Sequence, residues 1–133
     1  MLIVTTTIAC LLSLFFVRLT FNVINLRRKL KVSLGTGGHD SLERAIRAHG
    51  NFAEYVPMSL LLLACLEFNS APGLLVWALG IALLAGRVVH AIGINAPSKG
   101  ASMNRVRGMV VTLSTLMALA FCNLGWMVYQ LSA

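Results

Sequence analysis

The chain has 133 residues, of which 58% are hydrophobic and only 11% are charged, and its formal net charge is +7. Soluble domains average about 45–50% apolar and about 25% charged residues, so this composition excludes an ordinary soluble fold. Such a basic chain could suggest a nucleic-acid partner, but here the basic residues stand between long apolar runs. We therefore expect an integral membrane protein with one transmembrane domain over residues 1–133, surrounded by membrane lipids and with no nucleic acid as a partner.

Four apolar segments follow one another, at about residues 2–26, 44–68, 74–94 and 105–131. A helix needs about 20 residues to cross the hydrocarbon core of a bilayer, and each segment reaches that length. A backbone in lipid must satisfy its own hydrogen bonds, which a helix does and an open strand does not. The sequence therefore predicts an all-α fold, an integral membrane four-helix bundle.

Basic residues indicate how the bundle is oriented. The link between the second and third segments has Glu67 and no basic residue, and neither terminus carries a charged side chain. The other two links and their flanks hold the basic residues Arg27, Arg28, Lys29, Lys31, Arg44 and Arg47, and Lys99, Arg105 and Arg107. Because cytoplasmic loops are enriched in Lys and Arg, we expect these links in the cytoplasm and both termini on the other side.

Arg18 is a basic residue at membrane depth in the first segment. Its side chain either extends towards the cytoplasmic interface or is buried in an assembly with a polar surface. The three cysteines, Cys10, Cys65 and Cys122, stand alone in different apolar runs, without the spacing of a metal site or a redox pair. We expect no metal, and we expect these thiols to be buried for packing.

The second segment begins with polar residues and continues into an apolar part, 55–66, that is too short to cross a hydrocarbon core of about 30 Å. At about 100° per residue, several polar side chains share one sector of the helix, with Tyr55 at its edge and His49 elsewhere. The members of this polar stripe are Glu43, Arg44, Arg47, Asn51 and Glu54. Such a stripe must face another helix, a watery cavity or an anionic ligand, or else form an ion-pair network that orients the bundle.

The third and fourth segments add further cationic residues near the cytoplasmic face. Arg87 and His90 are three residues apart and share a helix face, and Glu54 is the first candidate partner for Arg87. His90 is either a proton donor or a packing residue. Arg105 and Arg107 open the fourth segment at the same level. Guanidinium groups bind carboxylates in a bidentate manner, so we expect a cationic site for a carboxylate-rich ligand.

The motif ERAIRAHGNFAE at the start of the second segment resembles the signature of the MAPEG family, the membrane-associated proteins in eicosanoid and glutathione metabolism. GRVVH in the third segment, RGM in the fourth and the four-helix length also fit that family. The resemblance covers essentially the whole chain. The GTGG loop and the continuation EYVP are most similar to the short bacterial-type branch, which implies a multi-pass protein of the bacterial inner membrane.

The resemblance implies a homotrimer that binds glutathione as co-substrate at the cytoplasmic side, between subunits, while a small apolar substrate arrives from the membrane. The implied glutathione-binding positions are Arg44, Arg47, Asn51, Glu54, Tyr55, Arg87, His90 and Arg27. Arg107, or Arg105 in its place, would stabilise the glutathione thiolate and so catalyse the reaction. A nearby guanidinium lowers the pKa of a thiol from its free value of about 8.5 and makes more of the nucleophilic thiolate.

Some positions depart from the family pattern: Gly50, Ile94 and Val111 stand where some eukaryotic members have arginine or tyrosine, and Asn25 stands where relatives have an arginine. An eicosanoid synthase is therefore not expected. The expected function is a glutathione transferase or peroxidase of detoxification, acting on apolar electrophiles or lipid hydroperoxides. The alternative is a non-catalytic membrane protein that binds lipid or glutathione. The chain shows no inverted repeat that would favour a transporter.

Overall fold

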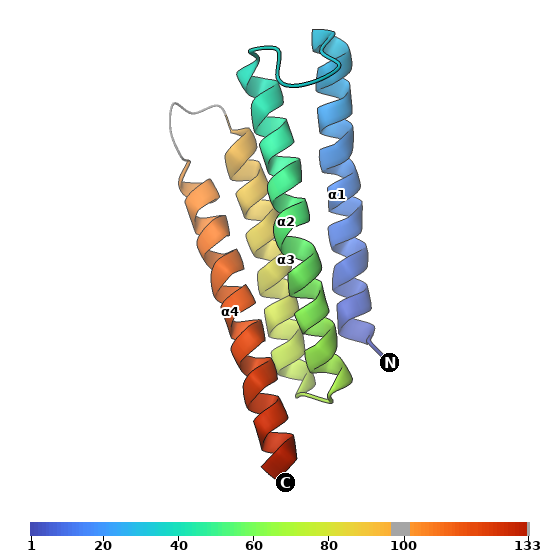
Figure 1. Ribbon diagram of the computed structural model, residues 1–133, viewed down its shortest axis with the longest axis vertical. Coiled ribbons are helices and arrows are strands. Elements are labelled where there is room, and N and C mark those ends of the chain that lie inside the picture. The colour runs from blue at the N-terminus through green and yellow to red at the C-terminus, as the bar shows by residue number, and fades with distance from the viewer. Residues whose placement is uncertain (97–101, 133) are drawn as a thin grey trace.

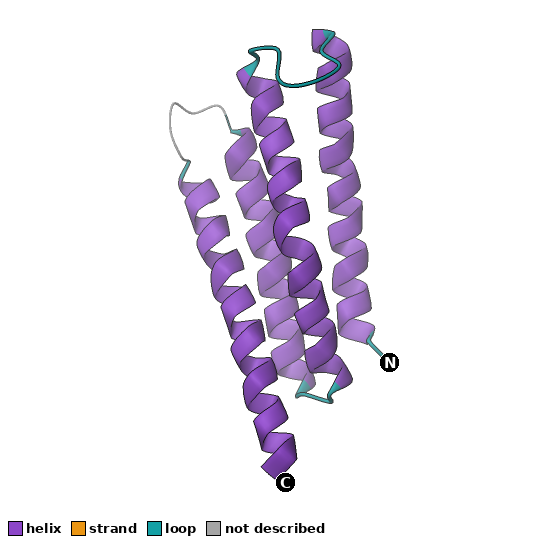
Figure 2. Cartoon of the chain, in the orientation of Figure 1, coloured by secondary structure: helices purple, strands orange, loops and turns teal. Residues whose placement is uncertain are grey.

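The computed structural model describes residues 1–96 and 102–132, which form four long helices arranged alternately up and down (Figure 1). Helix α1 spans Ile3–Leu30, α2 spans Asp40–Phe68, α3 spans Gly73–Asn95 and α4 spans Met103–Ser132. Loops connect these helices, and the described residues contain no strand (Figure 2). All four helices are long and apolar enough to cross a membrane. The predicted all-α four-helix membrane fold is confirmed, and Lys99 lies outside the described residues.

Two helices extend further into the first link than the apolar segments indicated. Helix α1 continues to Leu30, with Arg27, Arg28 and Lys29 in its last turn, and α2 already begins at Asp40. The reason is electrostatic, because cations stabilise the carbonyl end of a helix and anions such as Asp40 stabilise the amide end. Hydropathy alone marks only the part of a helix that lies in lipid.

The opposite end of the bundle, which holds both termini (Figure 1), is fastened by side chains that bind free backbone groups. The two carboxylate oxygens of Glu67 accept hydrogen bonds from the backbone N–H groups of Val4 and Thr5, at 2.8 and 2.7 Å. The first N–H groups of a helix have no partner within it, so Glu67 at the end of α2 caps the start of α1. Trp126 and Gln130 of α4 both donate to the Asn69 carbonyl at 2.7 Å.

Cys10 and Cys65 are exposed on the surface of the bundle, and Cys122 is partly buried. The expectation that all three thiols are buried is therefore wrong for Cys10 and Cys65. The outward faces of these helices are apolar, because a membrane chain meets lipid tails there, and a cysteine in an apolar run can face lipid as readily as the core.

Helices α3 and α4 pack backbone against backbone at two glycines, Gly93 and Gly108. A Cβ atom placed on Gly108 would clash with the backbone of His90, and one on Gly93 would clash with the backbone of Arg105. Small residues let the backbones of membrane helices come together in this way. The contact sets His90 of α3 directly against the first turns of α4.

Replacing Gly108 by alanine should lower the free energy of unfolding by about 1–3 kcal/mol, because the added methyl group must push α3 and α4 apart. The matched control is Gly125→Ala in the same helix, where nothing lies within 4 Å of the added Cβ atom. The control should be neutral or stabilising by up to about 1 kcal/mol, as alanine is the better helix former. Unfolding by SDS in mixed micelles measures both, and equal effects would contradict the close contact.

Candidate functional site

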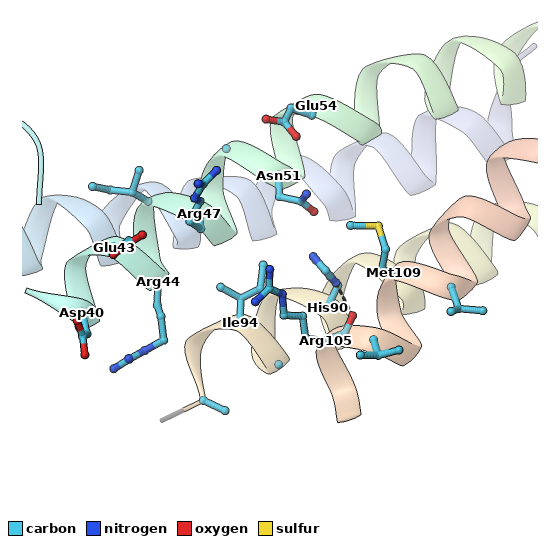
Figure 3. A pocket seen from close by; sticks show the side chains of 16 residues that line it. Asp40, Glu43, Arg44, Arg47, Asn51, Glu54, His90, Ile94, Arg105 and Met109 are labelled. Atoms are coloured by element: carbon cyan, nitrogen blue, oxygen red, sulfur yellow. Dashed lines mark hydrogen bonds between the residues drawn. The ribbon is translucent and has the colours of Figure 1, made fainter. Parts of the chain in front are cut away.

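A cleft of about 1130 Å³ opens between α2 and the adjoining ends of α3 and α4, at the end of the bundle that carries the basic residues (Figure 3). The whole polar stripe of α2 lines this cleft, together with His90 of α3 and Arg105 of α4. Opposite the stripe, Ala45, Ala48, Phe52 and Val56 are buried in the bundle. Helix α2 thus presents its apolar face to the core and its polar face to the cleft, as its periodicity predicts.

His49 lies apart from the stripe and faces α1. Its Nε2 is 3.1 Å from the hydroxyl of Thr20, and its ring stacks on Phe16 with the ring centroids 4.5 Å apart. The histidine of the RAH motif is thus a packing residue between α1 and α2, where it satisfies a hydroxyl group at membrane depth.

Arg87 of α3 is the most deeply buried charge among the described residues, with 1% of its surface exposed. Its Nη2 donates to the side-chain oxygen of Asn51 at 2.9 Å, and its guanidinium carbon lies 5.4 Å from the centre of the Tyr55 ring. Asn51 and Tyr55 are four residues apart on α2 and so present one face to Arg87. The contact between arginine and ring is an attractive cation–π interaction.

The expected ion pair between Arg87 and Glu54 is not found among the described residues. Glu54 is exposed at the cleft, whereas Arg87 meets the neighbouring face of α2 that carries Asn51 and Tyr55. The amide oxygen of Asn51 takes the place expected for a carboxylate. Because that oxygen accepts a hydrogen bond from Arg87, the amide N–H groups of Asn51 remain available as donors in the cleft.

Arg87 is sensitive to any loss of its partner, because its Nε and Nη1 groups already have no hydrogen-bond partner among the described residues. Asn51→Leu would remove the partner of Nη2 as well, and we expect it to lower the free energy of unfolding by about 1–3 kcal/mol. SDS unfolding in mixed micelles gives this value. The double variant with Arg87→Leu should lose less than the sum of the two single variants, and additive losses would show that the two side chains do not interact.

His90 has a defined hydrogen-bonding state. Its Nδ1 lies 2.7 Å from the backbone oxygen of Arg105, and only 2% of its surface is exposed. A carbonyl oxygen only accepts, so Nδ1 carries the proton, and in the neutral ring Nε2 is an acceptor. Figure 3 shows the ring directed towards Asn51, with the bond to Arg105 on its other side. The cleft therefore contains a nitrogen that can accept a proton.

The model of the MAPEG family matches residues 3–125 of this chain. The chain belongs to the MAPEG family. The inner membrane protein YecN of Escherichia coli strain K12 is 36% identical over 123 residues, which cover 92% of each chain. The same protein of Escherichia coli O6:H1 strain CFT073 gives the same values. The family membership that the ERAIRAHGNFAE motif predicted is thus confirmed, and the match extends over nearly the whole chain.

The two arginines that open α4 in this MAPEG protein point in different directions. Arg105 lines the cleft, whereas Arg107 is exposed and is not among the lining residues. Residues two positions apart on a helix point in directions that differ by about 200°, so Arg105 and Arg107 cannot both point into the same cleft. Within this chain, Arg105 and not Arg107 is therefore the arginine of α4 that lines the cleft.

Three other predicted site residues lie outside the cleft lining of this MAPEG chain. Arg87 donates to Asn51, and Tyr55 lies against the Arg87 guanidinium. Arg27 folds back on the link between α1 and α2, and its Nη1 donates to the carbonyl oxygens of Val32, Ser33 and Gly35 at 3.5, 3.2 and 3.1 Å. Arg27 therefore holds the link in place and does not line the cleft.

The cleft also has lining residues that were not among the predicted site residues. Asp40 belongs to α2, Gly93 and Ile94 to α3, and Met109 to α4. Helical spacing gives the available signal, since Met109 follows Arg105 by four residues and Ile94 follows His90 by four. Ile94 and Met109 supply an apolar wall opposite the polar stripe.

Proposed function

We propose that this MAPEG protein is a membrane-bound glutathione-dependent transferase or peroxidase that acts on apolar electrophiles or lipid hydroperoxides. The observation that carries the proposal is the composition of one cleft, in which guanidinium groups, a proton-accepting His90 nitrogen and an apolar wall come together. Glutathione offers matching groups: two carboxylates, an ammonium group and a thiol.

The polar stripe of α2 is suited to the charged ends of glutathione. Arg44 and Arg47 can bind carboxylates in a bidentate manner, which orients a ligand as well as attracting it. Glu43 and Glu54 can accept hydrogen bonds from the ammonium group. The amide N–H of Asn51 is held in place by Arg87 and can donate to a peptide carbonyl of the ligand.

The thiol is activated by Arg105 and His90. We assign the thiol proton to Nε2 of His90 and the charge of the resulting thiolate to the guanidinium of Arg105. With an electrophile, the sulfur electron pair forms a bond to carbon and the leaving group departs with its own electron pair. With a hydroperoxide, the sulfur bonds to the terminal oxygen as the O–O bond breaks, and the leaving alkoxide takes the proton held by His90 to become an alcohol. The glutathione sulfenic acid formed in this step then reacts with the thiol of a second glutathione and yields glutathione disulfide and water.

The apolar substrate enters from the lipid side. Val106 and Val110 line the cleft and are 47% and 57% exposed, so α4 offers apolar side chains along which such a substrate can approach. We place the cleft at the cytoplasmic face of a bacterial inner membrane. The basic residues near it support this orientation, and the relative YecN is named an inner membrane protein.

Arg105→Ala should reduce the thiolate formed from bound glutathione at neutral pH by about tenfold, the effect of a pKa change of one unit on a thiol. An ultraviolet thiolate difference spectrum in nanodiscs measures it, with Arg107→Ala as the matched control, since Arg107 lies outside the cleft lining. The control should keep the signal. A wild-type protein that binds no glutathione by calorimetry would overturn the proposal.

His90→Asn tests the proton acceptor, because an asparagine amide can still donate to the Arg105 carbonyl but offers no Nε2. Calorimetry in buffers of different ionisation enthalpy counts the protons released when glutathione binds. The wild-type protein should release less than one proton to the buffer for each thiolate formed, because His90 takes up the proton. The variant should form less thiolate and should release one full proton for each thiolate formed. S-methyl glutathione, which has no thiol proton, should bind both equally. The same number of protons released per thiolate in both proteins would exclude His90 as the acceptor.

A non-catalytic binding protein is the second candidate, and one observation favours it. The cleft is walled by Ile94, so the tyrosine that some family members have near this position is absent. Glutathione that binds to the wild-type protein without any thiolate signal would support this second candidate.

A further inference from the structure

We propose that Met109 is a redox modification site, at which an organic hydroperoxide in the cleft converts the thioether to a sulfoxide and so blocks the cleft to anionic ligands. The inference rests on the proposed function for one point only, the entry of a hydroperoxide from the membrane. Oxidation of Met109 itself needs no glutathione, so the modification can be tested apart from that function.

Met109 is the methionine that the fold places in the cleft. The chain has six methionines, and the other five are at least 53% exposed. Met109 is partly buried instead, and it lines the cleft. Figure 3 shows its side chain pointing from α4 towards Asn51 of α2. A hydroperoxide held in the cleft therefore meets the thioether of Met109.

Met109 has polar groups of three kinds around it in the cleft. Arg105 precedes Met109 by four residues, so both side chains share one face of α4, and both line the cleft. Gly108, the neighbour of Met109 in the chain, packs against the backbone of His90. Asn51 has amide N–H donors available, because its oxygen already accepts a hydrogen bond. The thioether is thus accompanied by a cation, a proton acceptor and hydrogen-bond donors.

These groups favour transfer of an oxygen atom to the sulfur of Met109. A sulfur electron pair forms a bond to the terminal oxygen of the hydroperoxide, the O–O bond breaks, and its electron pair leaves on the alkoxide oxygen. The guanidinium of Arg105 stabilises the developing alkoxide. Nε2 of His90 takes the proton of the terminal oxygen and passes it to the alkoxide, which departs as an alcohol. The thioether is oxidised to the sulfoxide as the hydroperoxide is reduced, so the step needs no other oxidant or reductant.

The sulfoxide changes the cleft, because it places a polar oxygen in what was an apolar wall. That oxygen is a hydrogen-bond acceptor, and it can take the amide N–H of Asn51, towards which Met109 points, or the guanidinium of Arg105. A donor bound in this way is no longer free for a carboxylate of an incoming ligand. The oxidised protein should therefore bind anionic ligands more weakly until the sulfoxide is reduced again.

Mass spectrometry of the protein in nanodiscs tests the site without any glutathione. Cumene hydroperoxide at neutral pH should oxidise Met109 about tenfold faster than Met117, which is on the same helix and 60% exposed but has no charged residue one helical turn away. Arg105→Ala should slow the oxidation of Met109 and leave that of Met117 unchanged. Arg107→Ala, outside the cleft lining, is the matched control and should change neither rate. Equal rates at Met109 and Met117 in the wild-type protein, or no effect of Arg105→Ala, would overturn the proposal.

Calorimetry tests the consequence for binding. After treatment with the hydroperoxide and its removal, the wild-type protein should bind glutathione about tenfold more weakly, the loss of one hydrogen bond to a charged group. Met109→Leu has no thioether at this position, so its affinity should be the same before and after treatment, whereas Met117→Leu should respond as the wild-type protein does. An equal loss of affinity in Met109→Leu would overturn the blocking role of Met109. Untreated protein that binds no glutathione would overturn the proposed function together with the blocking, while the oxidation rates would still decide whether Met109 is the modification site.

Discussion

The burial of Arg87 is the constraint on which the site of this protein depends. A guanidinium that is almost fully removed from solvent needs partners within the bundle, and here the amide oxygen of Asn51 accepts from Nη2 and the ring of Tyr55 lies against the group, while Nε and Nη1 have no partner among the described residues. These contacts fix the face that α2 presents to α3. Once that face is fixed, the remaining polar side chains of α2 face the cleft, and Asn51 is left with its donor groups available there.

The second determinant is the close contact of α3 with α4. Glycines at positions 93 and 108 let the two backbones meet, and this contact brings the carbonyl of Arg105 to the imidazole of His90. One hydrogen bond then sets the tautomer of His90, and the same turn of α4 carries the Arg105 side chain to the cleft. A backbone contact between two helices thus prepares an acceptor and a cation side by side, without an ion pair between them.

The scarcity of carboxylates determines how charge is distributed through the molecule. Eleven basic residues share four acidic ones, so most cations must be satisfied by carbonyl groups, amides, water or lipid headgroups. Arg27 binds three carbonyl oxygens of its own link, and Arg87 binds an amide oxygen. The cleft itself gathers three of the four carboxylates, Asp40, Glu43 and Glu54, beside three guanidinium groups, and so it presents both signs of charge.

The sequence by itself determined the four membrane helices, the polar face of α2 and the family, because hydropathy, helical periodicity and a dense motif are local properties of the chain. It did not determine which side chains meet. Asn51 rather than Glu54 receives Arg87, Arg105 rather than Arg107 lines the cleft, and Arg27 turns to its own loop. These outcomes depend on how the helices are rotated against one another, and that rotation is decided only when glycine contacts and buried polar groups are satisfied together in the tertiary structure.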